Sequence, residues 1–181
     1  MRSLFLAGAL AATALAGAQA ATPEQMGEFA GKPNMGVLHL QANLGSFKSI
    51  DGKGRFDVSF TGTVLLANYS GKALQISGNV RKEYDDKGRL VYFGTGRIVA
   101  SGEWRGLQWF GKDMHAVWYG SGVIRVAGEF DRNFKTGDYW YDIADEKQAF
   151  PATSVMTVYV PKPDFTGTTS AVPRERKKGG G

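Results

Sequence analysis

The sequence contains no cysteine and only two histidines, and these absences exclude several kinds of site. Without cysteine the chain forms no disulfide bond, no thiolate metal site and no cysteine nucleophile. His39 and His115 are the only imidazoles, which nearly excludes a zinc site built from several histidines. We therefore expect neither a metal nor a bound cofactor.

Apolar runs of membrane-spanning length are also missing beyond the first twenty residues. Residues 1–20 begin with Met1 and Arg2, continue with an alanine-rich apolar run over 3–17, and end with Ala18-Gln19-Ala20. This order is typical of a secretory signal peptide with its cleavage site, here of bacterial type. We therefore expect a periplasmic or secreted protein that begins at Ala21. An uncleaved anchor or a buried helix is the alternative.

The net charge of +5 and the isoelectric point near 9.4 would suit a nucleic-acid-binding protein. However, residues 161–181 hold five cations against two acids, and Arg2 lies in the predicted signal peptide, so residues 21–160 are close to neutral. We therefore expect no nucleic-acid partner. The tail is rich in Pro, Thr, Ser and Gly and is predicted to be disordered. Its cations either aid solubility or touch an anionic surface weakly; they include Arg174, Arg176, Lys177 and Lys178.

A short pattern of apolar-x-apolar-small-Gly-x-apolar occurs four times, at residues 58–64, 74–80, 98–104 and 124–130. In every copy the even positions are mainly apolar and the odd positions mainly polar. A period of two with one wet face is typical of antiparallel strands. The pattern therefore predicts four strands.

The glycine of each copy lies in the apolar row, where it would normally weaken a strand. It either allows a sharp bend or leaves room for an aromatic ring from a neighbouring strand. The intervals between Gly62, Gly78, Gly102 and Gly128 are 16, 24 and 26 residues. Because a solenoid would keep one constant period, these intervals favour a meander, with a solenoid as the alternative.

Further strands are expected at 36–42, 89–93, 114–119, 138–143 and 153–160, with turns at 51–54, 85–88 and 135–137. Apart from the signal peptide, the only helical turn is expected near Thr22–Ala30. The sequence thus predicts an all-β protein, a single antiparallel β-barrel or β-sandwich of eight to ten strands. The expected boundaries are a signal peptide over 1–20, an N-terminal segment over 21–34, a β-domain over 35–160 and a tail over 161–181.

Candidate catalytic groups are few. Neither histidine has a Ser or Asp partner at a recognisable spacing. Glu103 and Glu129 occupy equivalent positions in two copies of the pattern, with Asp131, Asp138 and Asp142 nearby. Two such carboxylates hydrolyse a glycoside if they lie roughly 5 to 10 Å apart. Solvent-exposed glutamates paired with arginines are the simpler interpretation, so we favour a protein that is not an enzyme.

Aromatic residues are dense between Trp104 and Tyr141 and must form much of the core. Because consecutive strand residues alternate in direction, some rings should nevertheless face water, beside polar side chains. The predicted binding residues are Trp109, Trp118, Asp138, Tyr139 and Trp140. We expect an exported binding or envelope-structural protein that contacts a glycan or a protein there. The alternatives are a secreted hydrolase and a small β-barrel carrier with an apolar cavity of roughly 300 Å³ or more.

Overall fold

The computed structural model describes residues 34–128, 136–141, 145–151 and 154–163, and their regular structure is entirely β. The strands are β1 (Gly36–Ala67), β2 (Ser70–Gly71), β3 (Gln75–Asp86), β4 (Arg89–Gly128), β5 (Gly137–Trp140), β6 (Gln148–Ala149) and β7 (Met156–Val160). They form one antiparallel sheet of seven strands, in which β1 and β4 are by far the longest. The predicted all-β class is confirmed.

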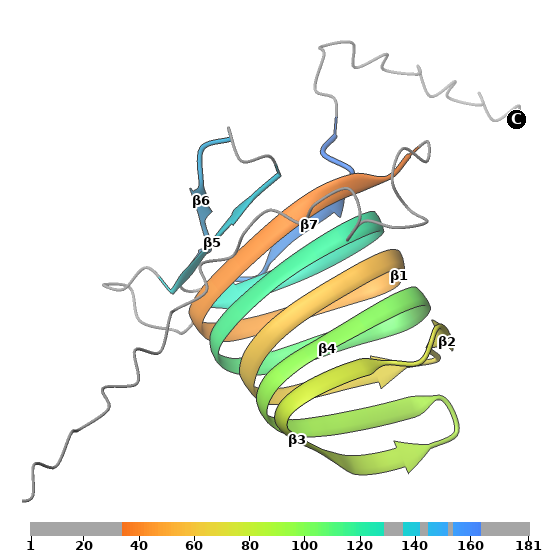
Figure 1. Ribbon diagram of the computed structural model, residues 1–181. Helices are drawn as coiled ribbons and strands as arrows, with labels where there is room; N and C mark the ends of the chain where they lie inside the picture. Colours follow the sequence, from red (N-terminus) through yellow and green to blue (C-terminus); the bar gives the residue numbers. More distant parts are fainter. Residues whose placement is uncertain (1–33, 129–135, 142–144, 152–153, 164–181) are drawn as a thin grey trace, which may run out of the picture.

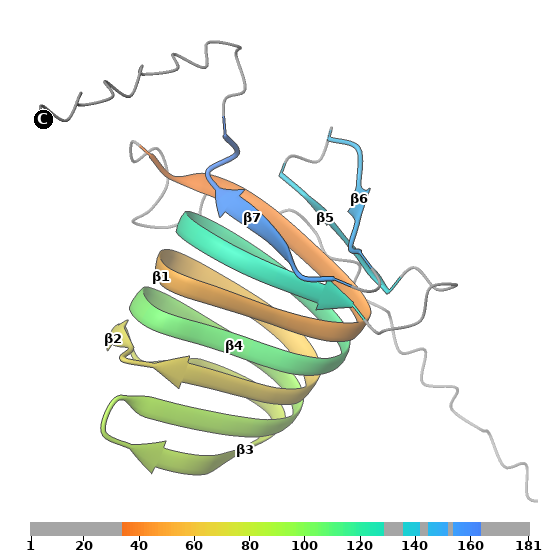
Figure 2. The ribbon, with the colours of Figure 1, turned by 180° about the vertical axis from the view of Figure 1, so that it is seen from behind.

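Strands β1 and β4 wind around a common axis as a two-stranded coil (Figure 1, Figure 2). Val58 of β1 lies opposite Ile98 on one side and Ala116 on the other. These two partners are 18 residues apart in β4, and the same double pairing recurs along most of β1. Each pass of β1 is therefore held between two passes of β4, and one turn of the coil takes 17 or 18 residues.

Glycines mark two lines along the coil, at the places where the strands bend. One line pairs Gly71, Gly102, Gly54, Gly120 and Gly36, and the other pairs Gly94, Gly62, Gly111, Gly45 and Gly128. Along each strand these glycines recur every eight or nine residues, which is half a turn.

Gly54 shows why glycine is required at these bends. Its φ is +123°, and a Cβ there would lie 1.9 Å from the backbone oxygen of Tyr119. Of the two roles considered from the sequence, the bend therefore applies at the glycine lines. The second role applies elsewhere, at Gly52, whose Cβ position lies 2.5 Å from the indole nitrogen of Trp104.

The two glycine lines divide the coil into two faces, each roughly 30 Å wide for nine residues at about 3.3 Å per residue. The first face contains residues 36–45, 54–62, 94–102 and 111–120, extended by β5. The second face contains residues 45–54, 62–71, 89–94, 102–111 and 120–128, extended by β7. Strand β3 continues both faces at the opposite end.

The sheet is not closed into a barrel. The structure has seven strands of very unequal length, where the sequence predicted eight to ten short ones. In the sequence each half-turn of β1 or β4 has the pattern of a separate strand, because a glycine interrupts the alternation of side chains at each bend. The expected turn at 51–54 is such a corner inside β1, with Asp51 at φ 48°. The meander prediction was wrong for a related reason. Of the four glycines compared, Gly62, Gly102 and Gly128 belong to a set that recurs every eight or nine residues, whereas Gly78 lies opposite Gly96 and outside that set.

The core lies between the two faces and is rich in aromatic rings. Phe56 contacts Trp109 at 4.5 Å between ring centroids, and Trp104 contacts Trp118 at 5.7 Å. The indole nitrogen of Trp104 donates to Ser49 Oγ at 3.0 Å inside this core. The predicted inward row is confirmed for most of the pattern; its buried members include Phe56, Val58, Phe60, Val64, Ile98, Ala100, Trp104, Ile124 and Val126.

Several predictions lie outside the described residues: the signal peptide, the helical turn near 22–30, Glu129, Asp131, Asp142 and the tail cations Arg174, Arg176, Lys177 and Lys178. Within the described ranges, no helix is long and apolar enough to cross a membrane.

Candidate functional site

Two of the predicted binding residues belong to the core. Trp109 and Trp118 are both 0% exposed, and each contacts Phe56. They therefore cannot form a surface patch in this structure. Asp138, Tyr139 and Trp140 remain, and all three lie on β5, at the end of the coil opposite β3.

Pairing with β1 sets the direction of the side chains on β5. Tyr139 lies opposite Leu40, whose side chain is in the core, and Trp140 lies opposite His39. Tyr139 and Tyr141 accordingly pack against the core. Trp140 is on the other side of the strand, with its ring stacked on His39 at 5.2 Å between centroids. The expected alternation of these rings is present, although Trp140 is only 9% exposed.

A small, half-open pocket of about 190 Å³ lies beside these rings. It is smaller than the roughly 300 Å³ at which pockets that bury a drug-sized ligand begin. It therefore suits one ring or one end of a longer ligand. Its lining residues are Tyr139, Trp140, Tyr141, Asp145, Glu146, Gln148 and Lys162.

The two tyrosines of the pocket act as hydrogen-bond donors. Burial raises the pKa of Tyr141 to about 12, and burial also raises the pKa of Tyr139 above its usual value. The hydroxyl of Tyr141 donates to the backbone oxygen of Tyr159 at 2.9 Å, and that of Tyr139 donates to Gln148 Oε1. Both phenols stay protonated near neutral pH and do not supply a general base there.

Charged groups of both signs surround the rings. Lys147 Nζ lies 4.4 Å from the ring centroid of Trp140, while Lys162 Nζ lies 5.6 Å from that of Tyr141. Lys162 also pairs with Asp145 at 3.1 Å. Glu146 is exposed and has no ion-pair or hydrogen-bond partner among the described residues. The pocket thus combines aromatic walls with a free carboxylate.

The structure does not test whether the two predicted hydrolase residues converge, because only Glu103 lies among the described residues. Glu103 is exposed on β4, opposite Lys53 and Ser70, and Glu129 lies outside the described residues. Arg97, an arginine on the same strand as Glu103, pairs with Asp57.

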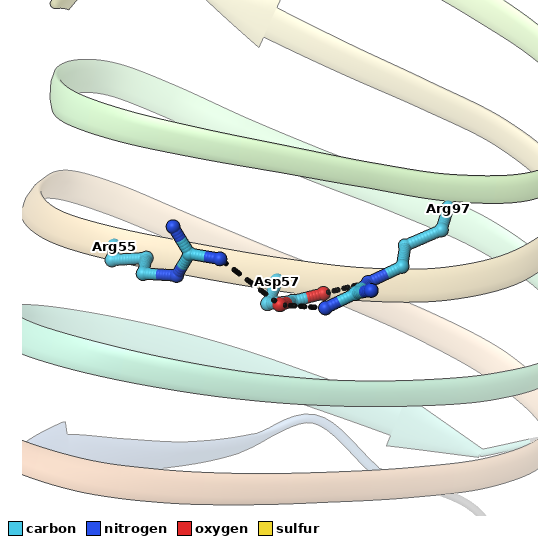
Figure 3. Close-up of polar contacts among 3 residues, drawn as sticks. All are labelled: Arg55, Asp57 and Arg97. Carbon is cyan, nitrogen blue, oxygen red and sulfur yellow. Dashed lines mark hydrogen bonds and ion pairs between the residues drawn. The ribbon is translucent and has the colours of Figure 1, made fainter. Parts of the chain in front are cut away.

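Asp57 lies between Arg97 and Arg55 on the outside of the first face (Figure 3). Arg97 Nε donates to Asp57 Oδ1 at 2.6 Å, and Arg55 Nη2 lies 3.5 Å from Asp57 Oδ2. The two arginines therefore neutralise the charge of the carboxylate, and this cluster is an ion-pair network on the surface of the sheet.

Neither histidine forms a metal centre in the part of the chain that the structure describes, where no cluster of three or more potential ligands occurs. His39 is buried beneath Trp140, and His115 lies opposite Ser59 and Gln41 on the first face.

Comparison with known proteins finds no matching family model, no matching curated protein and no matching solved structure. Sequence reasoning did not place Asp145, Glu146, Gln148 or Lys162 in the site, because only the folding of β5, β6 and β7 brings them together. Tyr141 had a visible signal, its place directly after Tyr139 and Trp140.

Proposed function

We propose that this is an exported, non-enzymatic β-domain protein that binds a glycan through the pocket between β5, β6 and β7. The observation that carries the proposal is the union of three consecutive aromatic residues with the free carboxylate of Glu146 in one half-open pocket. Aromatic faces pack on the apolar side of a sugar ring, while carboxylates and amides accept its hydroxyl hydrogens.

The size and chemistry of the pocket support binding of a sugar unit within a longer chain. A volume of about 190 Å³ that opens to solvent leaves the rest of a polymer outside. The protonated tyrosines offer no base, which favours binding over hydrolysis. The export part of the proposal rests on residues 1–20, and amino-terminal sequencing of the protein from the extracytoplasmic fraction should begin at Ala21.

Tryptophan fluorescence offers a selective test of glycan binding. Trp104, Trp109 and Trp118 are at most 2% exposed in the core, whereas Trp140 lines the pocket. Titration with soluble peptidoglycan fragments and a panel of oligosaccharides should change the emission of the wild-type protein. Trp140→Phe should abolish this change.

Carboxylate variants supply the matched control. Glu146→Gln should weaken binding by about tenfold or more, since a hydrogen bond to a charged group contributes roughly 1.5–3 kcal/mol. Glu103→Gln, which removes an exposed carboxylate elsewhere, should bind as the wild type does. The proposal fails if no glycan alters the emission, or if the two variants behave alike. Glycan cleavage that is lost in Glu103→Gln would support the hydrolase instead.

A further inference from the structure

The outer side of the second face carries an apolar part and a basic part next to each other, which together we name the amphiphilic face. Core residues fix which side chains point outward: Trp109, Phe47 and Val126 are buried, so their chain neighbours face water. The apolar part contains Leu65, Val91, Phe93 and Phe110, and the basic part contains Lys48 and Arg125.

The apolar part is unusually exposed for large hydrophobic side chains. Phe93 and Phe110 lie on either side of Thr63 in the pairing register and are 45% and 43% exposed. Leu65 and Val91 form the adjacent row and are half-buried. At the other end of the same face, Tyr159 of β7 is 53% exposed. Contiguous exposed apolar side chains of this kind mark interaction surfaces.

The basic part places two cations directly opposite each other. Lys48 of β1 pairs in register with Arg125 of β4, and both side chains are exposed. Like charges at opposed positions destabilise a sheet. The paired segments around them, residues 46–50, 106–110, 123–127 and 157–159, contain no Asp or Glu. Neither cation has an ion-pair partner among the described residues.

The first face differs from the second in that its arginines are paired with a carboxylate. There the guanidinium groups of Arg55 and Arg97 share the carboxylate of Asp57 (Figure 3). On the second face, Lys48 and Arg125 have neutral neighbours instead, with Gln108 on one side of the pair and Thr157 on the other. An external anion would relieve the repulsion that the sheet itself leaves uncompensated.

We propose that the amphiphilic face docks onto an anionic lipid membrane. The cations attract the phosphates of the headgroups, and the exposed rings of Phe93 and Phe110 enter the boundary between headgroups and acyl chains. An anion alone would account for Lys48 and Arg125 but not for the neighbouring rings. Weak contact with an anionic surface is one of the two roles that the sequence offers for Arg174, Arg176, Lys177 and Lys178, and in that role they would act on the same kind of ligand.

Vesicle co-sedimentation tests the proposal with the complete exported protein. Wild-type protein should sediment with vesicles that contain phosphatidylglycerol, bind pure phosphatidylcholine weakly, and be released as salt is raised. Lys48→Gln combined with Arg125→Gln should weaken binding on the order of 30-fold, since each cation near such a surface contributes about a factor of five. The charge-matched control is Lys87→Gln combined with Lys112→Gln, which should change binding by less than twofold.

Phe110→Ser should also weaken vesicle binding while leaving the thermal unfolding temperature nearly unchanged, because the ring is largely exposed. The proposal is overturned if both charge variants lose binding equally, which would indicate attraction by net charge alone. It is also overturned if the Lys48/Arg125 variant binds as the wild type does, or if soluble glycerol phosphate or an acidic polysaccharide competes fully with the vesicles. The glycan experiment is independent, since Glu146 and Trp140 lie outside the amphiphilic face.

Discussion

Single glycines decide whether β1 and β4 can bend twice in each turn. At Gly54 the backbone has a positive φ, and the neighbouring chain passes so close that a methyl group would overlap the oxygen of Tyr119. At Gly106, by contrast, the nearest atom to a Cβ would be Ala67 Cβ at an ordinary 3.5 Å. The two positions form a matched pair within one coil.

We predict that Gly54→Ala lowers the free energy of unfolding by about 3 kcal/mol, from the strained φ and the forced shift of a neighbouring strand. Gly106→Ala should change it by less than about 1 kcal/mol. Urea unfolding followed by tryptophan fluorescence measures both. Equal effects of the two substitutions would show that Gly54 is not a corner.

Burial of the Tyr141 hydroxyl makes the free energy of unfolding depend on pH in a predictable direction. Tyrosine is neutral when protonated, and the pKa of Tyr141 rises from about 10 to about 12 on folding. Between these values the folded state holds a proton that the unfolded state has lost, so stability falls as pH rises from about 10 to 12. Tyr141→Phe should flatten this fall. Unfolding curves over this pH range, with phenolate absorbance, provide the measurement.

Because side chains alternate in direction along a strand, the sequence predicted correctly that some aromatic rings face water, although not all of the residues chosen as surface candidates do so. In the pair Trp109–Phe110 one ring had to face outward, and the structure shows that it is Phe110. The sequence could not decide which of the two it was, because both faces of the strand carry large side chains there. The same ambiguity placed Trp118 among the expected surface residues.

Strand β3 is a free edge of the coil, and its sequence protects that edge. It pairs only with β4, and its inward row continues into an open hollow of about 600 Å³ beside Val80 and Tyr92. Lys82 lies in this row, with Nζ 6.0 Å from the ring centroid of Tyr92 and 2.9 Å from Asp85. A register shift follows between Lys82 and Tyr84. Inward charges and bulges are the usual means of preventing edge-to-edge pairing.

Lys82→Val should therefore promote self-association through β3, because it removes the inward charge and extends the apolar row. Sedimentation velocity at increasing concentration should show dimers or larger species for this variant. Lys87→Val, in the adjacent turn, should sediment as the wild type does. Unchanged sedimentation of Lys82→Val would mean that the edge is protected by other features.

At the level of the elements, the sequence predicted the strand character and the inward rows but not the length of the strands. The segment Asp51-Gly52-Lys53-Gly54 has the composition of a reversing turn, and its positive φ values agree with that composition. In the coil it changes direction by bending while its backbone stays paired with residues 102–104 of β4. The residue types at 51–54 predict the local backbone angles. Whether the backbone hydrogen bonding of the sheet continues through them depends on the neighbouring strands.

The fold of the whole molecule depends on a register that local patterns do not contain. Pairing of one β1 residue with two β4 residues 17 or 18 positions apart arises only when the two strands wind together. This register also assembles the basic pair Lys48–Arg125, so that site could not be found from sequence spacing. The pocket likewise needs β1, β5, β6 and β7 to meet at one end of the coil.

Because the chain lacks cysteine, introduced cysteine pairs test this register directly. Thr61 lies opposite Thr95 on one side and Lys112 on the other, whereas Ser77 pairs with Arg97 one strand further away. Opposed antiparallel residues are roughly 4.5–5.5 Å apart at Cα, within reach of a disulfide, and second neighbours are not. The coil predicts that Thr61→Cys cross-links efficiently with Thr95→Cys and, in a separate protein, with Lys112→Cys. Cross-linking of Thr61→Cys to Ser77→Cys instead would contradict the coil and support a meander.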